Sequence, residues 1–161
     1  MPLPLPSLRC RWAALALGAL LAACAGAPPR PAKTAEPGVV SVTTADPAQF
    51  SEARDNPRET AGERRAWVDA LSGYLSERAA DVLAPGQRLE VRIADVRRAA
   101  PPGIELDYTL RAADGRVLRE GRRHLHGGGP PTPPGAHAGD PLQHEKRLVD
   151  GWVEHDLAAA Q

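Results

Sequence analysis

Two histidines near residue 125 are the first side chains whose type and spacing could do chemistry. His124 and His126 are separated by one residue, so on a β-strand both rings would point to one face and could ligate the same metal ion. His137 follows in a glycine- and proline-rich stretch and is the candidate third ligand. A metal site also needs ordered supporting groups around its ligands. The preferred interpretation is a pair of solvent-facing histidines at a strand end, and no metal or other cofactor is predicted.

The sequence lacks the motifs of common enzyme classes. It has no Gly-x-Ser-x-Gly elbow for a nucleophilic serine, no phosphate-binding loop and no dinucleotide fingerprint. Acids such as Asp95 and Asp107 fall on expected strands, where surface carboxylates are usually solvated. We therefore expect a non-catalytic protein, with a hydrolase or metal-dependent enzyme that has an unrecognised site as the alternative.

The N-terminus has the three parts of a secretory signal peptide. Residues 1–11 carry two arginines and no acid, residues 12–21 are apolar apart from one glycine, and small residues follow at 22–27. The apolar run is far shorter than the ~20 residues that a membrane-spanning helix needs. Residues 1–23 are therefore predicted to be a signal peptide.

The cleavage region carries the one residue for which covalent chemistry is predicted. Leu21-Ala-Ala-Cys24 resembles the lipobox of bacterial lipoproteins, in which the cysteine thiol attacks a lipid donor. Cys24 is thus the predicted lipidation site, and two or three acyl chains would anchor the protein stably. The Ala25 that follows favours the outer membrane, with the protein facing the periplasm. The alternative is cleavage after Ala25 or Ala27, which would leave a soluble periplasmic protein.

Charge and cysteine content bear on nucleic-acid binding and on disulfide bonds. The full chain has 20 basic and 20 acidic residues, and removing Arg9 and Arg11 with the signal peptide leaves 18 basic against 20 acidic. That balance has no nucleic-acid footprint. The only other cysteine, Cys10, also leaves with the signal peptide, so no disulfide is expected in the mature chain.

Two segments rich in proline and small residues set the domain limits. Residues 24–38, beginning with the lipidated cysteine, are predicted to be a Pro/Ala-rich tether. Residues 127–139 form a Gly/Pro segment that cannot bury apolar surface, and a flexible loop is expected there. Residues 39–157 are accordingly predicted to be a single domain.

Two helices are expected in this domain. Thr60 and Glu63 form a capping box, from which a helix should run to about residue 83. Its expected apolar face comprises Trp67, Ala70, Leu71, Tyr74, Leu75, Ala79 and Val82. A second helix should begin with Asp140 as its cap and Pro141 in its first turn. Its apolar stripe comprises Leu142, Val149, Trp152 and Val153.

Strands are expected at 39–42, 89–93, 104–110 and 117–125, because apolar and polar residues alternate there or β-branched residues dominate. Asp114-Gly115 makes a tight turn between the last two. A two-residue loop would place Val117 on the Leu110 face. The favoured three-residue loop, with a bulge at Gly115, would pair Leu118 with Leu110 and leave Arg119 outside. The predicted fold class is α+β, with an antiparallel sheet of about four strands covered on one face by two helices.

The domain also resembles a known family, the bacterial exported family called domain of unknown function 3016. The resemblance covers most of residues 39–157 and omits a stretch that the family usually carries after Val96. It supports the fold and export and brings no activity. The segments that carry it are Val40-Ser-Val42, Asp46-Pro-Ala-Gln-Phe50, Pro85 to Val96, Pro102 to Tyr108, Asp114 to Gly121 and Asp140 to Trp152.

Three residues of the last segment are candidates for an interaction site. Glu145 and Lys146 hold the residue types of the family pattern, although a salt bridge or helix-end electrostatics is the preferred explanation for them. Trp152 is the third candidate, and its place on a helical stripe also fits a core residue.

The function expected from these features is that of an envelope lipoprotein that acts as a binding or interaction module. Its expected partners are the membrane, through the lipid anchor, and another envelope protein or the cell wall.

Overall fold

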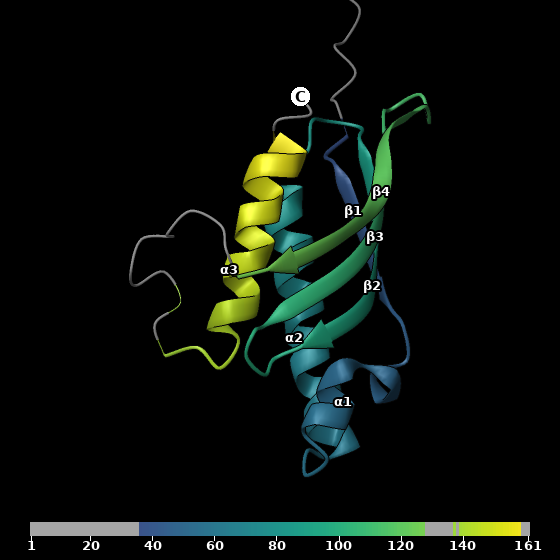
Figure 1. Ribbon diagram of the computed structural model, residues 1–161. Coiled ribbons are helices and arrows are strands. Elements are labelled where there is room, and N and C mark those ends of the chain that lie inside the picture. Colours follow the sequence, from purple (N-terminus) through teal and green to yellow (C-terminus); the bar gives the residue numbers. More distant parts are fainter. Residues whose placement is uncertain (1–35, 128–136, 138, 159–161) are drawn as a thin grey trace, which may run out of the picture. The chain divides into compact units, whose positions relative to one another are not determined.

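Four strands form one sheet in the order β1-β2-β3-β4 in the computed structural model of the protein (Figure 1). The structure describes residues 36–127, 137 and 139–158. The strands are β1 (Val39–Thr44), β2 (Arg88–Arg97), β3 (Gly103–Arg111) and β4 (Val117–His126). Together with the helices that pack on it, this sheet confirms the predicted α+β class.

One pair of strands differs from the predicted antiparallel arrangement. β2, β3 and β4 are antiparallel neighbours as expected, but β1 runs parallel to β2. Between them the chain forms η1 (Pro47–Gln49), α1 (Ser51–Asp55) and α2 (Ala61–Ala80). Because a helix as long as α2 carries the chain back along the sheet, the next strand starts from the same end as β1, which produces a parallel crossover.

The predicted capping box begins α2. The Thr60 side-chain oxygen accepts a hydrogen bond from the Glu63 amide, and the Glu63 carboxylate accepts one from the Thr60 amide at 2.8 Å. The helix ends at Ala80, three residues earlier than expected. Ala70 is exposed, so it does not belong to the buried face that was predicted for it.

The last helix begins later than its sequence suggests. α3 spans Gln143–Trp152 and continues into a π-helical turn, η2 (Val153–Leu157). Asp140 does not cap α3. Its side chain accepts from the Leu142 amide at 2.7 Å and its carbonyl accepts from the Gln143 amide at 3.0 Å, so it closes a separate turn ahead of the helix.

One core lies between the sheet and the two long helices. α2 and α3 lie on the same side of the sheet (Figure 1), as predicted, and they send their apolar stripes towards the inward side chains of β2 and β3. The buried apolar residues are Phe50, Trp67, Val68, Leu71, Leu75, Ala79, Leu89, Val91, Ile93, Val96, Ile104, Leu106, Tyr108, Leu110, Leu142, Val149, Trp152, Val153 and Leu157.

The β3–β4 hairpin has the expected turn but not the expected register beyond it. Gly115 has φ +85° and lies in a three-residue loop closed by the Ala112 amide and the Arg116 carbonyl. The register then shifts, so that Leu110 pairs with Arg119 and the predicted Leu118–Leu110 pair is wrong. The bulge absorbs one residue of β4 and thereby turns the Arg119 side chain inward, where it donates to the Asp156 carbonyl.

The remaining predicted segments lie outside the described residues. These are the signal peptide, most of the tether at 24–38 and most of the loop at 127–139. Among the described helices, none has the length and apolar character that crossing a membrane requires.

A pair of glycine substitutions tests the turn between α2 and β2. Gly86 has φ +79°, and a β-carbon there would lie 2.8 Å from the Ala113 β-carbon. Gly86→Ala should lower the free energy of unfolding by at least ~1–2 kcal/mol, because it adds a left-handed backbone penalty to a clash. The matched control is Gly73→Ala on α2, where no atom lies within 4 Å of the added carbon, and it should stabilise by up to ~1 kcal/mol. Urea denaturation measures both, and equal effects of the two variants would contradict this account of the turn.

Candidate functional site

The open face of the sheet is the surface formed by strand side chains that point away from α2 and α3. The period-two alternation that buries the aliphatic residues of β2 and β3 places their polar neighbours on this face. All of its side chains are exposed or partly exposed. Its members are Val39, Ser41, Thr43, Arg88, Glu90, Arg92, Glu105, Asp107, Thr109, Arg111, Glu120, Arg122 and His124.

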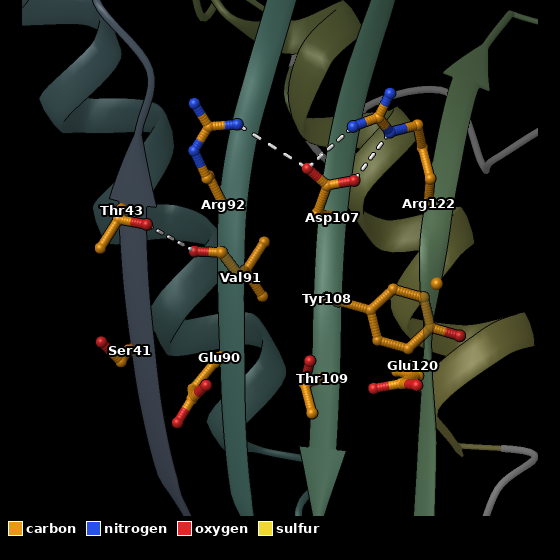
Figure 2. Close-up of a pocket in the computed structure, with 11 residues that line it drawn as sticks. Ser41, Thr43, Glu90, Val91, Arg92, Asp107, Tyr108, Thr109, Glu120 and Arg122 are labelled. Atoms are coloured by element: carbon orange, nitrogen blue, oxygen red, sulfur yellow. Dashed lines mark hydrogen bonds and ion pairs between the residues drawn. The ribbon is translucent and has the colours of Figure 1, made fainter.

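A row of ion-paired residues crosses the open face, and we call it the arginine row. Strand register aligns Thr43, Arg92, Asp107 and Arg122, and Figure 2 shows the two guanidinium groups on either side of the carboxylate. Arg122 Nε lies 2.7 Å from Asp107 Oδ1, and an Arg92 nitrogen lies 3.7 Å from Oδ2. The hydrogen bond from Arg122 is the main reason that the pKa of Asp107 falls below its usual value.

A second row lies two residues along each strand, and we call it the glutamate row. Register aligns Ser41, Glu90, Thr109 and Glu120. Among the described residues, neither glutamate has an ion pair or a side-chain hydrogen bond partner, in contrast to the arginines of the neighbouring row. The pattern behind both rows was visible in the sequence, because Glu90-Val-Arg92 on β2 repeats as Glu120-Gly-Arg122 on β4.

The two rows line a shallow hollow of about 620 Å³. Its walls carry carboxylates, guanidinium groups and hydroxyls, and the buried residues Val91 and Tyr108 also line it. The described part of the chain holds no group of three histidine, cysteine or acidic side chains placed to bind one metal ion. This chemistry suits recognition of charged and hydrogen-bonding groups.

A polar network between the helices is a feature that the sequence did not reveal. Asp150 on α3 accepts hydrogen bonds from the Tyr74 hydroxyl at 2.5 Å and from Arg78 at 3.2 Å, both on α2. Its second oxygen lies 2.9 Å from His137 Nε2. Burial alone would raise the pKa of Asp150, but these bonds together hold it below the usual value. The network therefore joins the two helices through a charged carboxylate.

A second buried polar group lies beneath the β2–β3 connection. The Arg98 guanidinium stacks over the Trp67 ring at 5.2 Å and lies 3.5 Å from a Glu59 oxygen. The Arg98 amide donates to Glu52, which is 4% exposed.

Glu145 is 2% exposed, its Oε2 has no partner among the described residues, and burial raises its pKa.

The three candidate interaction residues occupy different environments. Glu145 and Trp152 are buried, and the Trp152 ring makes an edge contact with Tyr108 at a centroid distance of 5.5 Å. Lys146 lies 2.5 Å from Asp140 and over the Tyr74 ring. The structure therefore does not bring the three together on one surface, and an interaction through them stays a prediction.

The histidines are also separated. His124 and His126 are exposed on β4, with His124 Nδ1 3.8 Å from Glu105 on the open face. His137 instead contacts Tyr74 and Asp150 on the two helices, which lie on the other side of the sheet. Cys24, the predicted lipidation site, lies outside the described residues.

Comparison with known proteins yields one match. The model of the family described as Protein of unknown function (DUF3016) matches residues 38–101 and 96–155. The two matched segments overlap at residues 96–101, at the end of β2 and in its connection to β3. No curated protein and no solved structure matches the chain.

Removal of the buried charge at Glu145 should stabilise the protein near neutral pH. Because the folded-state pKa of Glu145 is raised, the stability that it contributes is fully present below ~pH 4.3, the pKa of an unfolded glutamate. It is lost as the pH rises through the folded-state pKa. Glu145→Gln should therefore raise the free energy of unfolding at pH 7 by ~1–2 kcal/mol, the scale of one unsatisfied buried group, and the gain should vanish near pH 4.

Urea denaturation across this pH range provides the measurement. Glu77→Gln is the matched control, because Glu77 is exposed on α2 and its replacement should leave the pH dependence of stability unchanged. A Glu145→Gln variant that is less stable than wild type at pH 7 would show that Glu145 is charged and needed as an anion, and would contradict the prediction.

Proposed function

The chain belongs to the family described as Protein of unknown function (DUF3016), and we propose that it is a non-catalytic interaction module of the bacterial envelope, anchored by lipid on Cys24. The single observation that carries the interaction role is the open face. Its charged residues are ordered in rows across β2, β3 and β4, which Ser41 and Thr43 extend onto β1, and no described helix lies on that side of the sheet.

A sheet with one wet face is common, so exposure alone would carry little weight. The open face differs from an ordinary solvated face in the arrangement of its charge. Glutamates occupy one row and arginines the next, and the two rows line the hollow. Ordered charge of this kind supports recognition, because complementary potentials select a partner and fix its orientation.

The N-terminal sequence supports the proposed lipid anchor. The lipobox-like Leu21-Ala-Ala-Cys24 follows an export signal, and the Pro/Ala-rich residues 24–38 end where β1 begins at Val39. A tether of this composition would hold the domain away from the membrane while leaving it free to turn. Ala25 favours the outer membrane, and a soluble periplasmic protein is the alternative.

Substitution of the lipidation site tests the anchor. Wild type should begin at an acylated Cys24 and sediment with membranes, whereas Cys24→Ser should carry no lipid and lose the membrane association. Intact mass and membrane fractionation measure both properties. Cys10→Ser is the matched control, because Cys10 lies in the predicted signal peptide and its loss should change neither. Soluble wild-type protein that begins, unmodified, at Gly26 or Pro28 would overturn the anchor.

Photo-crosslinking from the rim of the open face tests the interaction role. A photoreactive amino acid at Ser41, which is exposed on β1, should give a discrete adduct in cells that make the full chain. The same amino acid at Ala70, exposed on α2, is the control and should give much less. Failure to form any adduct from Ser41 would contradict a partner at this face.

A further inference from the structure

The charge pattern of the open face is complementary to itself. On β2, Glu90 lies two residues before Arg92, and on β4, Glu120 lies two residues before Arg122. The two rows are separated by a row of Val42, Val91, Tyr108 and Gly121, which register aligns across the sheet and which sends no side chain onto the open face. A line drawn over this middle row therefore divides a negative row from a positive one.

We infer that the partner of the open face is a second copy of this chain, seated face to face about a two-fold axis that lies above the middle row and runs across the strands. The inference rests on the interaction role proposed above. Such an axis reverses the strand direction in the second copy and keeps each strand opposite its counterpart, which is an isologous contact.

This axis brings opposite charges together on β2 and on β4. Glu90 faces the partner's Arg92, and Glu120 faces the partner's Arg122. Sheets packed face to face lie ~10 Å apart, a gap that an arginine and a glutamate reaching from opposite sides can close. Arg92 and Arg122 have exposed fractions of 54% and 57%, so their remaining N–H groups are accessible although each already contacts Asp107.

The positions on β3 fit the same axis. Thr109 faces the partner's Asp107, so a hydroxyl donor meets a carboxylate acceptor. Two residues further out, Arg111 faces the partner's Glu105. An axis above the glutamate row would instead place each glutamate against its own copy. An axis above the arginine row would do the same for the arginines. The pattern thus selects one register and penalises its neighbours.

The size of the face predicts a weak contact. Four strands spaced by ~4.8 Å and about seven residues of ~3.3 Å each span roughly 450 Å² per copy, which is at the low end for a specific interface. Exposed charge pairs also contribute little individually and weaken with salt. Confinement of anchored copies to one membrane surface would raise their effective concentration and favour the contact.

Charge reversal and restoration in the full chain test this inference. With the photoreactive residue at Ser41, the wild-type adduct should have the mass of two copies. Glu90→Arg alone places two arginines opposite each other, and Arg92→Glu alone places two glutamates opposite each other. Because each change alters two symmetric contacts, each variant should reduce the two-copy adduct about tenfold.

The double variant Glu90→Arg/Arg92→Glu restores opposite charges and should recover the adduct. Co-expression of the two single variants should also recover it, as a mixed dimer, which keeps the test valid if the double variant folds poorly. Arg65→Glu is the matched control, because Arg65 is exposed on α2 and its reversal should leave the yield unchanged.

The outcomes separate this inference from the proposed function. An adduct from Ser41 with a different protein only would overturn the second copy and retain the interaction role. The absence of every adduct would overturn both. If the yield of the two-copy adduct is unchanged by the single reversals, the adduct reflects random encounter and the inference is overturned. The inference is also overturned if neither the double variant nor co-expression of the two single variants restores the yield.

Discussion

Burial of one face of the sheet under two helices determines where every charged strand residue lies. In β2 and β3 the aliphatic side chains occupy alternate positions and are almost completely buried. A slip of one residue would expose this set and bury Glu90, Arg92 and Asp107 instead, at a cost of several kcal/mol for each unpaired charge. The core therefore fixes the register, and the register in turn creates the two charged rows of the open face.

The helix side of the sheet uses polar groups differently. Asp150 joins α2 to α3 as a charged group, because Tyr74, Arg78 and His137 satisfy its oxygens. Glu145, five residues earlier on the same stretch of chain, has an oxygen without a partner among the described residues. Burial raises the pKa of both carboxyls, but the hydrogen bonds to Asp150 outweigh it and lower that pKa, whereas burial dominates at Glu145. Two acids of one helical segment thus have opposite charge preferences because of their neighbours alone.

Local patterns in the sequence predicted the helices and strands well, but they did not predict contacts between residues that are distant in the chain. The capping box at Thr60, the alternation in β2 and β3 and the turn at Gly115 each depend on neighbours in the chain. The parallel β1 depends on the path of a whole helix. The inward turn of Arg119 depends on a bulge that no local pattern marks, and the partner of Asp150 is a tyrosine 76 residues away.

The same limit applies to the candidate site. Alternation predicted which side chains face solvent, including Asp107, but a row across strands exists only once the register of all four strands is known. Glu145 and Lys146 were candidate site residues because their types match the family pattern. In the fold Glu145 is buried and Lys146 forms an ion pair with Asp140.

A face built from alternating charged rows reconciles solubility with association. Isolated copies keep the face hydrated, because charged and hydroxyl side chains make up most of it, with Val39 as an exposed apolar side chain at its β1 edge. An apolar face of equal area would associate more tightly but would also bind unrelated surfaces. Charged rows accept only a surface whose rows match in spacing and opposite sign. The proposed contact would be weak and would depend on concentration, which the proposed membrane anchor would raise. Under these two proposals the anchor and the open face would act on one equilibrium, since the anchor would set the effective concentration and the rows would set the register.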